Sequence, residues 1–314
     1  MVYFAPIVSA SAVTLSGDRP EKKERRAAAE QSISARSAYV ASRRGLAVER
    51  DARRYELAET IDPTIEIARE RGFARVEAGR LTLANEVVRE ANTLIDSISP
   101  DVLDKGGRKA KPYLVNNLVD FNEIGLDSPY LRFALNDEVL DAVTAYLGVV
   151  PVLYDFDVWY TLPWDAPLKG SQKWHLDHDD LTQIKVWVYC DDIGSETGPM
   201  TVLDAQRSVK LASEIGYDMG EVYRVPDEDV AAYRALGEIE QLTGDKGTVF
   251  FVDTSRCFHM GGRVDTDAKP RRTCHFQFVT PYSFNFGDHR DEAQFRHLAD
   301  GTNNERVRLV LGAS

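Results

Sequence analysis

The sequence predicts a mainly β domain, a sandwich or a barrel, with helices flanking it. From about residue 149 onward, apolar and polar residues alternate in short runs that Gly, Pro and Asp separate. Such runs are typical of many short strands joined by turns. Helix-forming sequence precedes them, and an acidic helical insertion interrupts them at 205–243. A chain of 314 residues is long enough for one large β-rich domain with helical additions.

Alternation and composition predict strands in five segments. A turn at Arg71-Gly72 leads into a short strand that ends at Val76. The other four segments are 152–159, 184–189, 248–252 and 273–280. In the segment 152–159, strict alternation places Val152, Tyr154, Phe156 and Val158 on one face and Leu153, Asp155, Asp157 and Trp159 on the other.

Helix signals gather in the first half of the chain. Residues 20–60 are rich in Arg, Ala and Glu, and Gly45 is expected to break their helical run. Apolar residues at helical spacing fill 83–98, and Asn136 is placed to cap a helix that continues to Leu147. The charged segment 20–60 is expected to be a solvated extension that packs on the core or on a second subunit. A lid or a docking arm is the alternative.

Charge and cysteine content exclude some classes of function. The net charge of −12 repels phosphate backbones, so nucleic acid is not expected as a partner. The three cysteines lack CxxC spacing and predict a reducing, cytoplasmic compartment. No run approaches the ~18 apolar residues of a membrane helix. The apolar start, Met1 to Leu15, lacks the basic residues that begin a signal peptide, so secretion is not expected.

Two histidines and an aspartate form the pattern that indicates chemistry. His175 and Asp177 stand two residues apart in Trp174-His175-Leu176-Asp177, so on a strand both would point to the same face. His259 follows an apolar run and would come from another strand. Two imidazoles and one carboxylate on one face of a metal leave the opposite positions open, as in non-haem Fe(II) oxygenases. These three residues are therefore predicted to be metal ligands and catalytic residues.

An arginine at the start of the last predicted strand could bind a carboxylate. Arg271 shares its face with three polar residues, Thr273, His275 and Gln277, whereas the face of Arg272 carries Cys274, Phe276 and Phe278. A polar set suits a cavity and an apolar set suits packing under helices, which favours Arg271 over Arg272. A guanidinium can bind both carboxylate oxygens, such as those at the far end of 2-oxoglutarate.

Five motifs lie within residues 70–285. They are WHLD (174–177), Lys185 to Met200 ending in GSETGPM, GDKGTVFFVD (244–253), FHMGG (258–262) and PRRTCHFQF (270–278). In these motifs the chain resembles the phytanoyl-CoA dioxygenase-like branch of Fe(II)/2-oxoglutarate oxygenases. The resemblance implies a cupin-like jelly-roll core, or double-stranded β-helix, and Fe(II), 2-oxoglutarate and O2 as cofactors.

The resemblance also implies roles at the co-substrate site. Arg271 would bind 2-oxoglutarate, and Trp187, which stands 11 residues before Gly198, would lie against it. Gly261 occupies a position where the family often has a serine that touches 2-oxoglutarate.

Further residues are expected at the cofactor site or in the substrate cavity. Lys185 is a candidate for the cofactor site, and Tyr160, Gln172 and Tyr189 are candidates for the substrate cavity; ordinary strand packing is an equal alternative for all four. His275 is expected to be a residue of the cavity wall rather than a fourth metal ligand.

These observations predict an N-terminal helical extension at 1–65, an oxygenase domain at 66–290 and a C-terminal tail at 291–314. The expected activity is hydroxylation of an unactivated C–H bond of a small molecule, in natural-product biosynthesis for example, with release of succinate and CO2. Desaturation, cyclisation or epimerisation by the same cofactors, a metal cupin that does not use 2-oxoglutarate, and a catalytically silent binding module are the alternatives. The N-terminal helices offer a surface for a homo-oligomer, and no membrane partner is expected.

Overall fold

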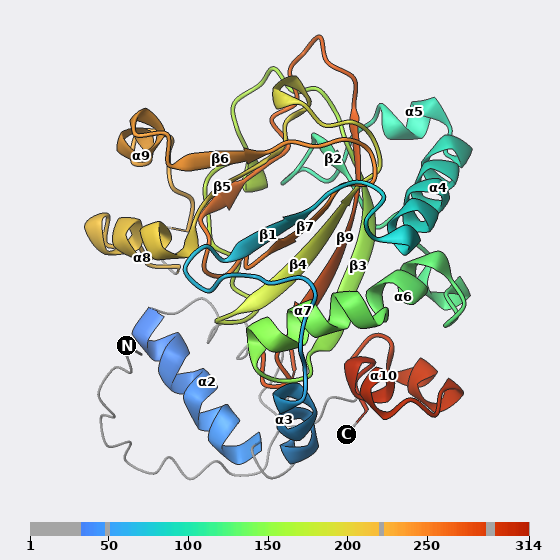
Figure 1. Cartoon of the computed structure of the whole chain (residues 1–314). Coiled ribbons are helices and arrows are strands. Elements are labelled where there is room, and N and C mark those ends of the chain that lie inside the picture. The colour runs from blue at the N-terminus through green and yellow to red at the C-terminus, as the bar shows by residue number, and fades with distance from the viewer. Residues whose placement is uncertain (1–32, 48–50, 220–222, 287–292, 314) are drawn as a thin grey trace.

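Two antiparallel sheets form the centre of the computed structural model, which describes residues 33–47, 51–219, 223–286 and 293–313 (Figure 1). The larger sheet has six strands in the order β1-β7-β4-β9-β3-β2, and the smaller has three in the order β6-β5-β8. Among the described residues, no helix combines the length and the apolar character that crossing a bilayer requires.

The strands are β1 (Phe73–Val76), β2 (Leu114–Val115), β3 (Val152–Thr161), β4 (Gln183–Tyr189), β5 (Met200–Leu203), β6 (Ile239–Leu242), β7 (Val249–Val252), β8 (His259–Met260) and β9 (Arg271–Val279). The α-helices are α2 (Ile33–Ala47), α3 (Ala52–Glu59), α4 (Thr82–Ser97), α5 (Pro100–Leu103), α6 (Pro129–Ala134), α7 (Asp137–Leu147), α8 (Ala205–Glu214), α9 (Ala231–Ala235) and α10 (Glu305–Val310). Short 3-10 turns are η1 (Phe121–Glu123), η2 (Gly170–Gln172), η3 (Ser195–Thr197) and η5 (Arg296–Gly301).

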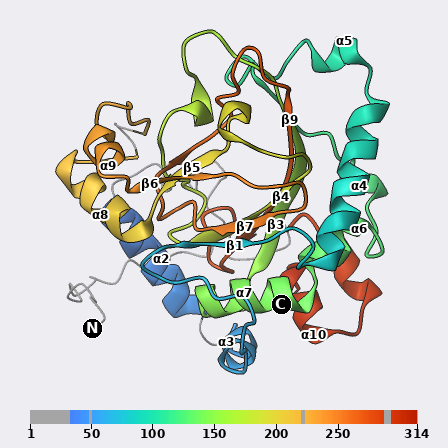
Figure 2. The ribbon, with the colours of Figure 1, turned by 45° about the horizontal axis from the view of Figure 1, so that its top comes forward.

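The two faces of the larger sheet differ in character. Phe276 of β9 pairs with Phe156 on one side and Val186 on the other. These side chains belong to the main apolar core, to which α4, α6 and α7 also contribute (Figures 1 and 2). The alternate residues Thr273 and His275 are also buried, but they face the opposite side. The predicted separation of polar and apolar residues along this strand is therefore confirmed.

Strand β3 departs from strict alternation. Its register with β9 shifts between Leu153 and Asp155, so Tyr154 is an extra residue. Leu153 consequently joins Phe156 in the main core, whereas Val152 and Tyr154 pack in a separate apolar cluster. The prediction that Val152 and Tyr154 share a face with Phe156 was wrong, because a β-bulge reverses the parity of the residues before it.

The smaller sheet shares an interior with the polar face of the larger one. One apolar cluster combines Trp187 and Phe250 of the larger sheet with Met200, Val202 and Leu242 of the smaller. Two sheets that enclose a common interior form the jelly roll, or double-stranded β-helix, that the sequence predicted. Within the described residues the two sheets stay separate and do not close into a barrel.

The helices predicted from periodicity form close to their expected bounds. Helix α4 buries Val87, Val88 and Ile95 against the sheet. Helix α7 begins after Asn136, whose side chain accepts a hydrogen bond from a backbone N–H of the first turn. It ends at Gly148, which has the left-handed conformation common after helices.

The predicted helical insertion contains two helices and also a strand. Helices α8 and α9 lie beside the smaller sheet (Figure 1). Residues 239–242, at the end of the predicted insertion, form β6, which pairs with β5. Residues 220–222 of the insertion are outside the described part of the chain.

Helix α2 belongs to the predicted N-terminal extension and packs on the body of the molecule. The buried guanidinium of Arg36 donates to the backbone carbonyls of His178 and Asp180, at 3.1 and 3.3 Å. The ring of Tyr39 stacks on Phe284, with 5.4 Å between centroids. The helix continues through Gly45, so the predicted break was wrong. A glycine costs a helix only about 1 kcal/mol relative to alanine, which other contacts can offset.

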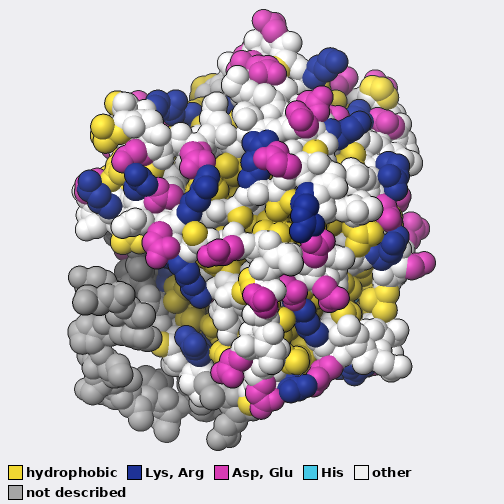
Figure 3. All heavy atoms as spheres, viewed as in Figure 1, with side chains coloured by type: hydrophobic (Ala, Val, Ile, Leu, Met, Phe, Trp, Pro, Cys, Tyr) yellow, Lys and Arg dark blue, Asp and Glu magenta, His cyan; other side chains and the backbone are white. Residues whose placement is uncertain are grey.

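Acidic and basic side chains are mixed over the face of the molecule that Figure 3 shows. No broad basic area is visible among the described residues of this face. The expectation that nucleic acid is not a partner stays a prediction, as does the homo-oligomer. Residues 1–32 of the predicted extension are outside the described part of the chain.

Candidate metal centre

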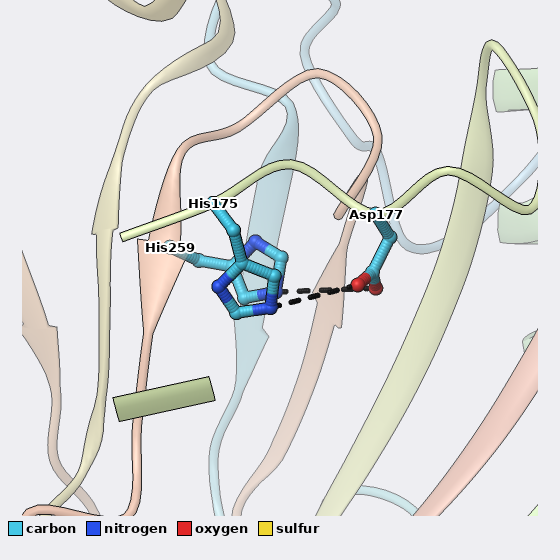
Figure 4. A group of neighbouring side chains, drawn as sticks. All are labelled: His175, Asp177 and His259. Atoms are coloured by element: carbon cyan, nitrogen blue, oxygen red, sulfur yellow. Dashed lines mark ion pairs between the residues drawn. The ribbon is translucent and has the colours of Figure 1, made fainter. Parts of the chain in front are cut away.

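Three side chains of the types that bind metals converge between the two sheets: His175, Asp177 and His259 (Figure 4). Their ligand atoms all lie within 4.8 Å of one another. Nε2 of His175 is 3.7 Å from Oδ1 of Asp177, and Nε2 of His259 is 3.9 Å from Oδ2. All three residues are buried. Within the described residues, no second group of three or more His, Cys, Asp or Glu side chains meets the same distance condition.

The segment that carries His175 and Asp177 is not a regular strand. His175 forms an isolated antiparallel bridge with His259, in which each backbone N–H donates to the other carbonyl at 3.0 Å. The N–H of Asp177 donates to the carbonyl of Thr254 at 2.8 Å. The predicted strand at 174–177 was therefore wrong, although the two side chains do converge as expected.

Backbone hydrogen bonds orient both imidazoles. Nδ1 of His175 lies 2.8 Å from the carbonyl oxygen of Lys173, and Nδ1 of His259 lies 3.0 Å from that of Cys257. A carbonyl can only accept, so Nδ1 carries the proton and Nε2 keeps its lone pair. Burial lowers the pKa of both rings, most strongly for His175, and keeps them neutral. Neutral imidazoles with a fixed tautomer are suited to binding a metal.

Lys185 pairs with the carboxylate of this group. Its Nζ lies 2.7 Å from Oδ2 of Asp177, and both side chains are largely buried. Burial opposes ionisation of Asp177, but the charge of Lys185 holds the pKa of its carboxyl well below the ordinary value. Asp177 is therefore an anion across the neutral pH range, as a metal ligand must be.

A cavity lies beside the three candidate ligands. All four residues predicted at the cofactor site line it, namely Arg271, Trp187, Gly261 and Lys185. Of the four predicted substrate residues, Tyr189 also lines it, and its hydroxyl donates to the carbonyl of Leu242. Thr273, which was predicted on the cavity side of its strand, lines it too. The lining residues that were not predicted from the sequence are Lys111, Tyr113, Leu114, Trp159, Thr161, Ser171, Met200 and Gly262.

Arg271 reaches this cavity from β9, where it pairs with Thr161 of β3. The side chain is only 6% exposed. One Nη donates to the carbonyl of Gly198, the other lies 3.4 Å from the hydroxyl of Thr161, and Nε has no hydrogen-bond partner. Burial lowers the pKa of this guanidinium. No carboxylate of the described residues lies within ion-pair distance of it.

Arg272 points to the opposite face, as its parity requires. Its guanidinium lies 2.8 Å from a carboxylate oxygen of Asp96 and 3.8 Å from one of Asp191. Asp96 lies on α4, which packs on this face of the larger sheet, and Asp191 follows β4; both carboxylates are exposed. Tyr160 pairs with Arg272 and shares that face, so this predicted substrate residue does not line the cavity.

An aromatic wall closes one side of the site. The Trp187 ring is stacked on His275 at 5.1 Å, and Trp159 meets Trp187 edge-on at 4.9 Å. Burial and the nearby charge of Lys185 lower the pKa of His275 to about 3. His275 does not line the cavity itself. It contacts the two tryptophan rings.

Gln172 makes hydrogen bonds to the backbone and does not face the cavity. Its side-chain amide donates to the carbonyl of Gly262 at 2.9 Å and accepts from the backbone N–H of Lys169 at 3.1 Å. It is buried and is not among the residues that line the cavity. The residues missed by sequence reasoning include Lys111, which has no strand pattern to mark it, and Thr161, whose pairing with Arg271 depends on the register of two strands.

Comparisons with known proteins give only partial likenesses. No family model matches the chain, and no curated protein is similar to it. Among solved structures, the apoform of EctD from S. alaskensis is similar to this chain. The match covers 70% of this chain and 82% of the EctD chain, with 16% sequence identity and a TM-score of 0.46. The match to the epimerase SnoN in complex with Fe3+, alpha ketoglutarate and nogalamycin RO covers 76% of this chain and 85% of the SnoN chain, with 18% sequence identity and a TM-score of 0.43. Since these scores lie below 0.5, the functional assignment depends on the residues of the site.

Proposed function

We propose that this chain is an Fe(II)/2-oxoglutarate-dependent dioxygenase of the phytanoyl-CoA dioxygenase-like branch, which hydroxylates an unactivated C–H bond of a small molecule. Two neutral imidazoles and one carboxylate, with ligand atoms within 4.8 Å of one another, suit Fe(II) and leave positions open for other ligands. His175, Asp177 and His259 would hold the ion. A cytoplasmic location remains part of the proposal.

Arg271 is the observation that supports 2-oxoglutarate as co-substrate. Its guanidinium is buried in the cavity beside the candidate ligands and meets no carboxylate of the described residues. Burying a cation is costly unless an anion meets it. 2-Oxoglutarate carries a carboxylate at each end, so one end can reach the metal while the other pairs with Arg271. A metal cupin that does not use 2-oxoglutarate has no need for this arginine.

The other residues of the site support the same reaction. When bound, Fe(II), 2-oxoglutarate and O2 supply the oxidation of the C–H bond and release succinate and CO2. Lys173 and Cys257 fix the two imidazoles through their carbonyl groups, and Lys185 orients the carboxylate of Asp177. Trp187 and Trp159 form an apolar wall that keeps water away from the ligands.

Anaerobic spectroscopy tests this proposal. The full chain with Fe(II) and 2-oxoglutarate under argon is expected to show the weak visible charge-transfer band of a chelated 2-oxo acid. Admission of O2 is then expected to release succinate, slowly when no substrate is present. His175→Ala is expected to lose the band, whereas Arg272→Leu is the matched control that keeps it. Absence of both band and succinate would favour the plain metal cupin. A product without a new hydroxyl group would favour desaturation, cyclisation or epimerisation.

A further inference from the structure

We propose that Asp253 is a positioning residue for the metal centre, because its carboxylate holds the turn that places the candidate ligands. This turn, residues 253–257, connects β7 to β8. Asp253 is not itself a candidate ligand and acts through the backbone of the turn. The inference rests on one part of the proposed function, the binding of a metal ion by His175, Asp177 and His259.

One carboxylate oxygen of Asp253 fixes the path of the turn. The residue is completely buried. Its Oδ1 accepts hydrogen bonds from the backbone N–H groups of Ser255 and Arg256, at 3.2 and 3.1 Å. The backbone carbonyl of Asp253 accepts from the N–H of Cys257 at 2.9 Å. Buried N–H groups require acceptors, so the conformation of the turn depends on this one residue.

The other carboxylate oxygen ties the turn to the rest of the fold. Oδ2 accepts from the hydroxyl of Tyr146 on α7 and from that of Thr182 just before β4, both at 2.8 Å. A hydroxyl can also accept a hydrogen bond, so an amide nitrogen in the place of Oδ2 could donate to these groups. Asparagine can therefore replace Asp253 and keep the bonds of Oδ1, whereas alanine removes both sets.

The turn supplies the acceptors that hold two of the ligand residues. The carbonyl of Thr254 accepts from the N–H of Asp177 at 2.8 Å, and the carbonyl of Cys257 lies 3.0 Å from Nδ1 of His259. His259 also forms the reciprocal backbone bridge with His175. A displacement of the turn would therefore move both carbonyls together and disturb all three ligand residues.

Gln183 gives Asp253 a second connection to the site. Its backbone N–H donates to Oδ1 of Asp253 at 3.4 Å. Its side-chain amide donates to the hydroxyl of Thr254 at 2.9 Å and lies 3.4 Å from Oδ2 of Asp177. Gln183 is also completely buried. Loss of an outer partner that orients metal ligands typically lowers metal affinity by about 10- to 100-fold.

Titration of the full chain with Mn(II), followed by the EPR signal of the free ion, tests the inference. Asp253→Ala is expected to lower the Mn(II) affinity of the folded protein by roughly 10- to 100-fold. Asp253→Asn is expected to keep most of the affinity, because its amide oxygen can accept the same N–H groups.

Asp157→Ala is the matched control. The side chain of Asp157 is also buried and accepts from the backbone N–H groups of Asn117 and Leu118, but it makes no recorded bond to the turn. This variant is expected to unfold at lower urea concentration than the wild type and to bind Mn(II) with the same affinity. Far-UV circular dichroism shows that each variant is folded during the titration.

The visible spectrum of the Co(II)-loaded protein separates positioning from folding. It is expected to change in Asp253→Ala and to stay as in the wild type in Asp253→Asn and Asp157→Ala, because only the first displaces ligand residues. Wild-type Mn(II) affinity and Co(II) spectrum in folded Asp253→Ala would overturn the inference. Equal losses of affinity in the alanine and asparagine variants of Asp253, or in Asp157→Ala, would do the same. If Asp253→Ala does not fold, Asp253→Ser is judged by the same criteria.

The 2-oxoglutarate band distinguishes failure of this inference from failure of the proposed function. Metal binding that depends on Asp253, in a protein that gives no band with 2-oxoglutarate, would support the inference and contradict the oxygenase. A band that persists with wild-type metal affinity in Asp253→Ala would support the oxygenase and contradict the inference. A wild-type protein that binds neither Mn(II) nor Co(II) would contradict both.

Discussion

Nζ of Lys185 lies 2.7 Å from Oδ2 of Asp177, so one oxygen of the candidate metal-binding carboxylate is held by a lysine. The other oxygen, Oδ1, lies 3.7 Å from Nε2 of His175. The lysine thus orients the carboxylate beside both imidazoles, since Oδ2 also lies 3.9 Å from Nε2 of His259. It also means that Asp177 has a buried counter-ion whose removal can be measured.

Lys185→Met is expected to destabilise the metal-free protein. Removing one partner of a buried ion pair leaves the other charge uncompensated, at a cost of about 3–5 kcal/mol. Mn(II) is expected to restore part of this stability, because it supplies a positive charge to the same carboxylate. Urea unfolding with and without Mn(II) measures both effects. Equal free energies of unfolding for variant and wild type, without metal, would show that the pair contributes nothing.

His259→Ala and His275→Ala form a matched pair of buried imidazole deletions. The first removes a ligand nitrogen, so Fe(II) binding is expected to be lost while the fold remains. The second removes a ring that only packs between Trp159 and Trp187, so Fe(II) binding is expected to persist with some loss of stability. Equilibrium dialysis with Fe(II) under argon gives the occupancy of each. Full occupancy in the His259 variant would contradict the assigned metal centre.

Arg271→Leu is expected to raise the apparent 2-oxoglutarate constant by roughly 10- to 150-fold, since hydrogen bonds to charged groups contribute about 1.5–3 kcal/mol. Arg272→Leu removes partly exposed ion pairs with Asp96 and Asp191 that are worth about 0–1 kcal/mol, and no change in the constant is expected. The charge-transfer band, titrated with 2-oxoglutarate, reports both. The reverse pattern would mean that the side chains of β9 face the other way.

Replacement by serine is expected to affect stability differently at Gly261 and at Gly262, the two neighbouring glycines after His259. A Cβ at Gly261 would lie 3.7 Å from the nearest atom of Met200 and 3.9 Å from Arg271, so Gly261→Ser is expected to fold with stability within about 0.5 kcal/mol of the wild type. Its hydroxyl would stand near the guanidinium, and 2-oxoglutarate is expected to bind several-fold tighter.

Gly262→Ser is the control for that substitution. Gly262 has a φ of +75°, and a Cβ there would lie 3.1 Å from the Tyr113 ring, so a loss of about 1–3 kcal/mol is expected. Thermal and urea unfolding compare the two variants. Similar losses at both glycines would contradict the open space assigned to Gly261.

Arg36→Met is expected to loosen the segment that follows Asp177. Its guanidinium donates to the carbonyls of His178 and Asp180, and leaving buried carbonyls unpaired costs about 1–3 kcal/mol. We expect lower stability and faster release of Mn(II) to a chelator. Arg44→Met, on the exposed side of α2, is the control. Unchanged release from the Arg36 variant would mean that α2 does not support the metal site.

Sequence patterns predicted the parts of this protein that local rules determine. Period-two alternation assigned Arg271 and Arg272 to opposite faces, and Asn136 marked the start of α7, because each signal depends on a few neighbouring residues. The spacing of His175 and Asp177 also brought the correct side chains together. The physical reason given for this convergence was wrong. The backbone bridge between His175 and His259 and the hydrogen bond from Asp177 to Thr254 hold the two side chains in place, and no regular strand does so.

The remaining features depend on contacts between distant segments. The bulge at Tyr154 arises from the register of β3 on β9, and nothing in the alternation itself announces it. Lys111 reaches the cavity through the path of a loop, which no periodic pattern marks.

The candidate metal ligands and the cavity-lining residue Lys111 stand on different kinds of backbone. His175 and His259 are held to each other by two reciprocal backbone hydrogen bonds, whereas Lys111 stands in a loop outside both sheets. Substitutions, insertions or deletions in that loop can change the shape and charge of the cavity without moving the atoms that would bind iron. Engineering of the cavity should begin at the loop around residue 111, and natural descendants of the chain can diversify there while keeping the candidate metal ligands.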